Sequence, residues 1–235
     1  MFFPIRDDNP TVRTPFLTVA LIVVNTLAFL YTKSLGARGF EEFTFTYGFI
    51  PDIFFNLDHK YLVPNWVYWT PLTSMFMHGG WMHLIGNMVF LWIFGNNVED
   101  YFGPVKFIIF YLLSGIAAVA VYSVFSLTSQ VPLVGASGAI AGVMGAYIVL
   151  HPRAQITCLL FFIIIQFVTL PAKVVLGIWF ALQVVMSMIG SSSGGGVAWL
   201  AHVGGFIFGA AVLWVVVKIK GGRPYGGQRV YRMQW

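Results

Sequence analysis

The stretch LVGASGAIAGVMGAY, residues 133–147, decides how the rest of the sequence is interpreted. It is strongly apolar, yet it carries one serine, Ser137, between Ala136 and Gly138. Small residues recur four positions apart along it, such as Gly138 and Gly142, and this spacing lets two membrane helices approach closely. Helix packing alone would account for such a stretch. A functional role for Ser137 therefore depends on what the other apolar segments carry.

The composition of the whole chain is that of an integral membrane protein. Of its 235 residues, 58% are hydrophobic and only 9% are charged, whereas soluble proteins have about 25% charged residues. Apolar runs occur at 16–32, 81–97, 105–127, 137–150, 172–189 and 199–217. Most are close to the ~20 residues that span a bilayer. The sequence therefore predicts an all-α polytopic membrane protein, a single domain over 1–235 with six transmembrane helices.

One further apolar run, 156–170, could form a seventh span or lie at the membrane interface. With the N-terminus inside and six alternating spans, ten Lys and Arg residues fall on the cytoplasmic side and three outside. This distribution obeys the positive-inside rule, and a seventh span would move the basic tail at 218–235 to the outside. The pattern favours an interfacial segment and places both termini in the cytoplasm.

The connections also differ in character. The first external loop, 33–77, is rich in aromatic residues, which predicts a segment associated with the membrane interface. The connection at 190–197 consists mostly of glycine and serine, which predicts mobility.

The net charge of +5 comes mostly from the basic tail, so it indicates contact with the lipid surface and not with nucleic acid. We expect no cleavable signal peptide, because the first apolar run lacks a small-residue cleavage site.

Polar and ionisable residues inside membrane spans are costly and are therefore functional candidates. In FMHGGWMHLIGN, His83 and Asn87 are four residues apart and share one face of the predicted helix. His78 precedes two glycines and is expected in the loop or in the first turn. Taken alone, each of these residues could be explained by helix packing or by a position at the membrane interface. Together, His83 and Asn87 direct two hydrogen-bonding groups to one side of the helix.

The last apolar run carries a third candidate, His202. His202, Gly205 and Gly209 share one helix face, so the histidine stands above a groove of glycines. That groove needs a partner helix, and the small-residue face that follows Ser137 matches it. Packing of these two helices would bring His202 close to Ser137.

The candidate residues also agree in predicted depth, because all of them stand near the outer ends of their spans. The run 137–150 has fourteen residues, so as a helix it covers roughly 21 Å of a hydrocarbon core that is ~30 Å thick. Ser137 is therefore expected below the outer surface. The loop above it must be covered by protein or open to a water-filled cavity.

These residue types support acyl-transfer chemistry. A neutral imidazole can take the proton of a serine hydroxyl, so His202 is the candidate general base for Ser137. The backbone N–H of Ser137 at a helix N-terminus, together with Asn87 and His83, could donate to an oxyanion. No carboxylate lies at the same depth. The sequence thus predicts a Ser-His dyad without the orienting acid of a triad.

Three motifs in this order, HGGWMHLIGN, GASG and AHVGGFIFG, resemble those of the rhomboid intramembrane serine proteases, over about residues 69–213. The resemblance implies a rhomboid-like bundle of six transmembrane helices with a membrane-embedded first loop and no cofactor. It implies single-span transmembrane proteins as substrates, cut near the outer end of the span. The resemblance implies that Ser137 is the nucleophile and His202 the base. It implies that the oxyanion donors are His83, Asn87 and the Ser137 backbone. It also implies that His78, Gly135 and Gly138 lie near the site and that Gly205 and Gly209 are packing residues.

Two positions depart from the family pattern. The Trp-Arg pair common in the first loop is Trp69-Thr70 here. Ala141 stands where some members have a tyrosine that stacks on the histidine, so His202 needs another contact to hold its ring. The acidic pair Glu99 and Asp100 is expected to be structural.

Two alternatives remain open at this stage. A protein of the same fold could bind transmembrane clients without cleaving them, although inactive relatives usually lack the serine or the histidine. His78, His83 and His202 could instead supply three imidazoles to a metal site or a transporter, but no carboxylate accompanies them and no inverted repeat is visible. A chain of this architecture is expected in a bacterial or archaeal plasma membrane. The sequence gives no oligomeric state.

Overall fold

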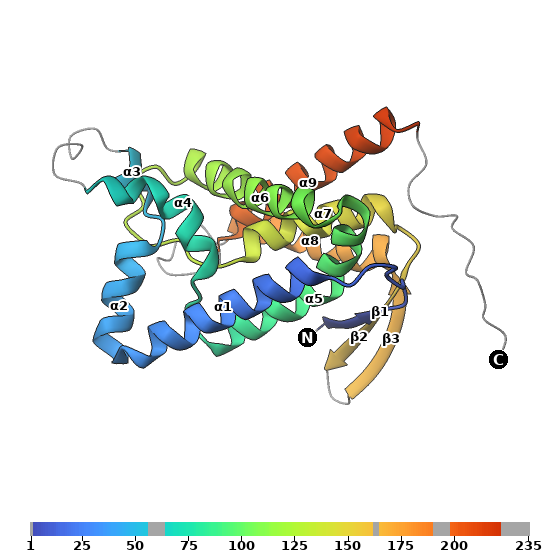
Figure 1. Ribbon diagram of the computed structural model, residues 1–235, viewed down its shortest axis with the longest axis horizontal. Helices are drawn as coiled ribbons and strands as arrows, with labels where there is room; N and C mark the ends of the chain where they lie inside the picture. Colours follow the sequence, from blue (N-terminus) through green and yellow to red (C-terminus); the bar gives the residue numbers. More distant parts are fainter. Residues whose placement is uncertain (1, 56–63, 162–164, 190–197, 222–235) are drawn as a thin grey trace.

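The computed structural model describes residues 2–55, 64–161, 165–189 and 198–221 (Figure 1). The described part is mostly helical, with a small β-sheet at one end of the bundle. The long helices are α1 (Phe16–Ser34), α5 (Trp81–Phe102), α6 (Pro104–Val124), α7 (Ser137–Leu150), α8 (Ala172–Ile189) and α9 (Trp199–Ile219). Each of them corresponds to one of the six apolar runs; α7 and α8 begin and end where their runs do, and α6 ends three residues before its run.

Four of these helices, α1, α6, α8 and α9, are long and apolar enough to cross a membrane. The chain is therefore an integral membrane protein built as a helical bundle, as its composition predicts. Helix α7 is apolar but has only 14 residues, and α5 ends in the polar stretch GNNVED. A count of six transmembrane spans stays a prediction.

The first loop folds into short helices at the end of the molecule opposite the sheet (Figure 1). They are α2 (Gly36–Tyr47), α3 (Pro51–Phe55), a 3-10 helix at Asn65–Trp69, α4 (Thr70–Thr73) and a 3-10 turn at Ser74–Phe76. Phe49 and Leu133 exchange two backbone hydrogen bonds, of 3.0 and 2.8 Å. This pair ties the first loop to the segment that leads into α7.

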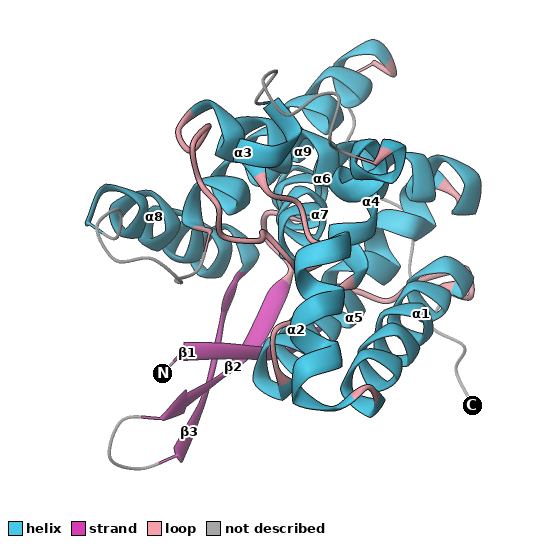
Figure 2. Cartoon of the chain, turned by 90° about the vertical axis from the view of Figure 1, so that its left-hand side faces the viewer, coloured by secondary structure: helices cyan, strands magenta, loops and turns pink. Residues whose placement is uncertain are grey.

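The apolar run 156–170 forms strands in its described residues, a structure that the choice between a seventh span and an interfacial segment does not include. Strand β2 (Gln155–Phe161) pairs antiparallel with β3 (Ile165–Pro171) on one side and with β1 (Phe2–Asp7) on the other. The run is rich in isoleucine, phenylalanine and threonine, which favour strands. The described residues of the run therefore form no seventh helical span, the alternative that the charge pattern disfavours. The sheet extends away from the helices (Figure 2).

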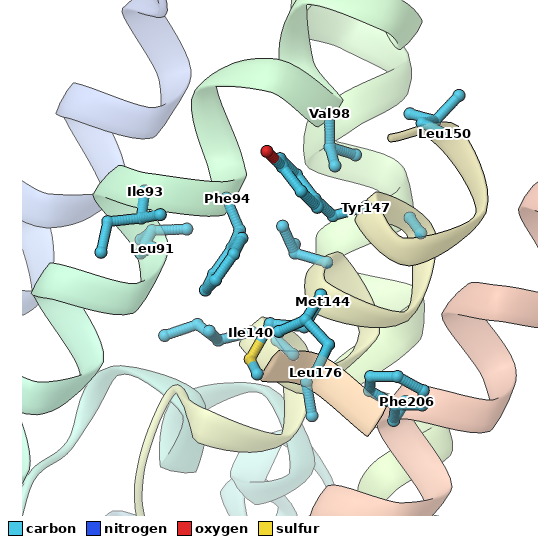
Figure 3. Close-up of a cluster of buried hydrophobic side chains, with 14 of the residues drawn as sticks. Leu91, Ile93, Phe94, Val98, Ile140, Met144, Tyr147, Leu150, Leu176 and Phe206 are labelled. Atoms are coloured by element: carbon cyan, nitrogen blue, oxygen red, sulfur yellow. The ribbon is translucent and has the colours of Figure 1, made fainter. Parts of the chain in front are cut away.

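Helix α7 lies at the centre of the bundle, between α5, α6 and α9. Every residue from Gly138 to Tyr147 is buried. Figure 3 shows Ile140, Met144 and Tyr147 of α7 within the apolar core, with Phe94 and Phe206 contributed by neighbouring helices. The rings of Phe94 and Tyr147 meet edge to face, with centroids 5.0 Å apart. Burial on all sides explains why α7 is apolar around its whole circumference.

Helices α7 and α9 touch backbone to backbone along a line of glycines, which we call the glycine seam (Gly138, Gly142, Gly145, Gly205 and Gly209). A Cβ atom on Gly205 would collide with the carbonyl oxygen of Gly138, and one on Gly209 would collide with that of Gly142. A Cβ on Gly145 would likewise strike the carbonyl oxygen of Phe206. The two helices can approach this closely because Gly145, Gly205 and Gly209 carry no side chains at the contact. Side chains on Gly138 and Gly142 would instead strike Ala118 and Ser114 of α6.

The acidic end of α5 holds the start of α1. Glu99 accepts hydrogen bonds from the backbone N–H groups of Leu17 (2.9 Å) and Thr18 (2.7 Å), and it is buried. Asp100 accepts from the N–H groups of Val12 and Arg13. Carboxylates at a helix N-terminus satisfy free N–H groups and interact favourably with the helix dipole. Glu99 and Asp100 therefore have the structural role expected for them.

Asp7, at the end of β1, links the sheet to the central helix. Its carboxylate accepts a hydrogen bond from the Tyr147 hydroxyl (2.6 Å) and another from the Asn97 side-chain amide (2.9 Å). Burial raises the pKa of Asp7 above its ordinary value, and the two hydrogen bonds only partly oppose this. The folded protein therefore binds a proton at Asp7 more tightly than the unfolded chain does.

The glycine seam gives a first prediction. Gly209→Ala should lower the stability of the folded protein, by about 1–3 kcal/mol or more, because its Cβ meets backbone that has no room to move. Thermal unfolding in detergent measures the effect. Gly177→Ala is the matched control, since a Cβ there meets nothing within 4 Å, and a Gly209→Ala protein as stable as this control would contradict the seam.

Asp7 gives a prediction of pH dependence. Its contribution to stability is fully present at acid pH and is lost as the pH rises through its raised pKa. Asp7→Asn keeps an acceptor for the Tyr147 hydroxyl without the charge, so its Tm relative to wild type should be higher at about pH 7.5 than at about pH 4.5. Glu41→Gln, at an exposed position of α2, controls for the loss of one negative charge. A Tm difference that stayed constant with pH, or grew toward acid pH, would show that the Asp7 environment is not as described.

Candidate active site

The structure brings Ser137 and His202 into contact. Ser137 is the first residue of α7, and its Oγ lies 2.8 Å from Nε2 of His202, near the start of α9. His202 is buried, whereas Ser137 is half-buried. Ser137 directly precedes Gly138 of the seam, and His202 stands three residues before Gly205, which packs against Gly138. The close approach of the two helix backbones therefore sets the separation of the two side chains.

The other ring nitrogen of His202 contacts a residue that the sequence reasoning missed. Nδ1 of His202 lies 2.7 Å from Oε1 of Gln183, on α8, and the Gln183 side chain is 5% exposed. The ring of Trp179, one turn earlier on α8, lies 5.9 Å from the His202 ring. These contacts hold the imidazole where Ala141 offers no aromatic ring. The signal was present in the sequence, because Gln183 is an amide within an apolar run.

His83 and Ser137 both lie beside Gly135. A Cβ atom on Gly135 would lie 2.7 Å from Nε2 of His83 and 3.5 Å from Oγ of Ser137, so both atoms border the same small space. Gly135 has a φ of 131°, which L side chains rarely adopt. The backbone N–H of Gly79 donates to Nδ1 of His83 (3.4 Å), which leaves Nε2 to carry the proton of the neutral ring. His83 thus presents an N–H donor toward the side of Gly135 where Ser137 lies.

Asn87 and His78 supply buried polar atoms near His83. Asn87 lies one turn further along α5, and its Nδ2 is buried and donates to no other described residue. The His78 ring lies 5.2 Å from that of His83, and both its nitrogens are buried without a partner in the described part of the chain. Buried polar atoms are nearly always hydrogen-bonded, to protein or to water. Unpartnered donors here are free for a ligand or for water.

The loop before Ser137 is held in place from the first loop. Gly135 donates its N–H to the carbonyl oxygen of Ser74 (2.9 Å), two residues after the Phe49–Leu133 backbone pair.

The expected mobile connection at 190–197 lies outside the described residues, as do residues 222–235 of the basic tail. Within the described ranges, no three His, Cys, Asp or Glu side chains gather as a metal site would require. The three-imidazole site of the metal alternative is therefore absent from that part of the chain.

Comparison with known proteins places this geometry in a family. A family profile described as the Rhomboid domain matches residues 65–219. The chain belongs to the rhomboid family. All the residues of the candidate site, from His78 to Gly209, lie within the matched range. Gln183 lies within it too.

Individual rhomboid relatives match over differing shares of this chain. RHOMBOID-like protein 6, mitochondrial, of Arabidopsis thaliana is 39% identical over 38% of this chain and 29% of its own length. Rhomboid protease GluP of Bacillus subtilis is 37% identical over 42% of this chain and 19% of its own length. Rhomboid-like protein 11, chloroplastic, of Arabidopsis thaliana is 30% identical over 72% of this chain and 61% of its own length. The chain thus spans less than a third of the first two relatives.

The names of these rhomboids bear on localisation. They include mitochondrial and chloroplastic proteins as well as a bacterial one. Family membership therefore gives no support to a bacterial or archaeal plasma membrane in particular. It does agree with an integral membrane protein.

Proposed function

We propose that this rhomboid is an intramembrane serine endopeptidase that cleaves single-span transmembrane proteins near the outer leaflet. The observation that carries the proposal is the 2.8 Å contact between Oγ of Ser137 and Nε2 of His202 at the start of a buried helix. Family membership adds support, because the name of one relative, Rhomboid protease GluP, describes a protease. The proposal takes the Ser-His pair as a catalytic dyad.

In the proposed mechanism, Oγ of Ser137 attacks the scissile carbonyl carbon while Nε2 of His202 takes the hydroxyl proton. Collapse of the tetrahedral intermediate breaks the C–N bond, and His202 returns the proton to the leaving amine. A water molecule then attacks the acyl-enzyme with His202 again as base. This releases the carboxylic acid and restores Ser137.

The proposed oxyanion site uses the donors that surround Ser137. As the first residue of α7, Ser137 has a backbone N–H with no partner inside the helix. The N–H of His83 borders the same space as Oγ of Ser137, and Nδ2 of Asn87 donates to no other described residue. Fixed donors in a site of low dielectric stabilise a developing negative charge strongly. His78 is proposed to hold water near the site, and no cofactor is invoked.

The position of the dyad supports a membrane substrate. Ser137 opens a helix of 14 residues, which covers only ~21 Å of a ~30 Å core, so a scissile bond would have to enter the bilayer to reach it. We propose a single domain of six spans with both termini cytoplasmic and a first loop in the outer interface. The basic tail would then face anionic lipid headgroups.

Ser137→Ala and His202→Ala should each abolish cleavage of a single-span substrate and labelling by a fluorophosphonate probe, because each removes a reacting group. Gel assays with the purified protein in detergent measure both. Ser123→Ala is the matched control, since that buried hydroxyl bonds only the backbone of its own helix, at Val119, and it should keep normal activity. Near-normal cleavage by either dyad variant would refute the dyad. A folded wild type that neither cleaves nor labels would favour a protein that binds transmembrane clients without cleaving them.

Asn87→Ala should lower kcat by ~10²–10³ with little change in KM, because an oxyanion donor acts mainly in the transition state. Steady-state kinetics on a single-span substrate separate the two constants. Gly86→Ala, on the preceding residue of α5, is the control, since a Cβ there meets nothing within 4 Å. An Asn87→Ala protein with raised KM and unchanged kcat would assign Asn87 to substrate binding instead.

A further inference from the structure

We propose that Gln183 is a positioning residue that fixes the tautomer and orientation of His202, the base in the proposed Ser-His dyad. This inference rests on the proposed function, because it assigns His202 the role of base. It starts from the 2.7 Å contact between Oε1 of Gln183 and Nδ1 of His202. Neither a carboxylate nor an aromatic ring on α7 takes this place.

The hydrogen bonds of Gln183 determine which end of its amide faces the imidazole. Nε2 of Gln183 donates to the backbone carbonyl oxygen of Trp179, one turn earlier, at 3.3 Å. If the amide were reversed, its oxygen would face that carbonyl oxygen, and two acceptors would meet. The amide oxygen therefore faces His202 and accepts a hydrogen bond.

The acceptor on Gln183 decides where the imidazole carries its proton. A neutral imidazole has one N–H, so a ring that donates from Nδ1 to Gln183 has a bare Nε2. The bare Nε2 lies 2.8 Å from Oγ of Ser137 and can accept the hydroxyl proton. The opposite tautomer would donate from Nε2 to the serine and could not act as base. The amide thus selects the tautomer that the chemistry needs.

Burial makes this selection effective. Gln183 is 5% exposed and His202 is 9% exposed, so solvent competes little for Nδ1. The ring of Trp179 flanks the imidazole at 5.9 Å, with an angle of 34° between the planes. An amide accepts a hydrogen bond without adding a charge, and a charge buried at membrane depth would be costly. A neutral acceptor is therefore suited to this position.

Gln183→Leu tests the proposal, because leucine fills similar space without an acceptor. Its kcat for a single-span substrate and its rate of fluorophosphonate labelling should both fall by about 10- to 100-fold, with KM unchanged. The loss is smaller than the ~10²–10⁴-fold that a general base contributes, because the productive tautomer stays partly populated. Gln183→Glu restores an acceptor and should recover part of both rates. Ser187 stands one turn beyond Gln183 on α8, and its hydroxyl donates to the backbone carbonyl oxygen of Val184. Ser187→Ala is therefore the matched control and should behave as wild type.

The ¹⁵N spectrum of the imidazole gives a readout that a merely structural role would not move. The His202 signals, assigned by their absence in His202→Ala, should report protonation at Nδ1 in the wild type and lose that preference in Gln183→Leu. A Gln183→Leu protein with unchanged kcat would overturn the proposal. So would one whose His202 tautomer is unchanged and whose lower kcat is explained by a smaller folded fraction. The spectrum needs no activity. A wild type without cleavage or labelling therefore refutes the proposed function, whereas a wild-type His202 protonated at Nε2 refutes the role of Gln183.

Discussion

Contact between the backbones of α7 and α9 is the constraint on which the rest of the structure depends. Carbonyl oxygens of Gly138 and Gly142 occupy the places where side chains of Gly205 and Gly209 would stand. Such contact requires glycine at each position. It also fixes the height of one helix against the other, and Ser137 and His202 stand directly above it. The distance between their side chains follows from the packing below them, and not from any flexible loop.

The remaining elements hold this pair of helices from three sides. Helix α8 reaches His202 through Gln183, and the first loop holds the segment before Ser137 through backbone bonds at Leu133 and Gly135. At the opposite end of α7, the Tyr147 hydroxyl bonds Asp7 of the sheet. Both ends of a helix of 14 residues are thus tied to parts of the chain distant in sequence. These ties add to the contact with α9 in fixing the position of a short, fully apolar helix along the membrane normal.

The sequence predicts the helical part of this fold well, because apolar runs of membrane length have few alternatives to a helix in a bilayer. The fold class is confirmed, and the helices over 137–150 and 172–189 have the expected ends. The strands at 155–171 escaped prediction because an apolar run rich in β-branched residues fits a helix and a hairpin alike, and only pairing with β1 decides. The contact of Ser137 with His202 could be anticipated from matched glycine faces. Gln183 could not be placed beside His202, since no spacing relates α8 to α9.

The order of the elements along the chain gives the glycine seam a consequence for biogenesis. Helix α7 is synthesised before α8 and α9, and the carbonyl groups of Gly138 and Gly142 that pack on Gly205 and Gly209 have no such partner until α9 enters the membrane. A nascent chain therefore carries the serine without the histidine beside it. The site can assemble only when α9 has been inserted and has displaced lipid from α7, so a chain arrested before α9 holds no completed Ser-His pair.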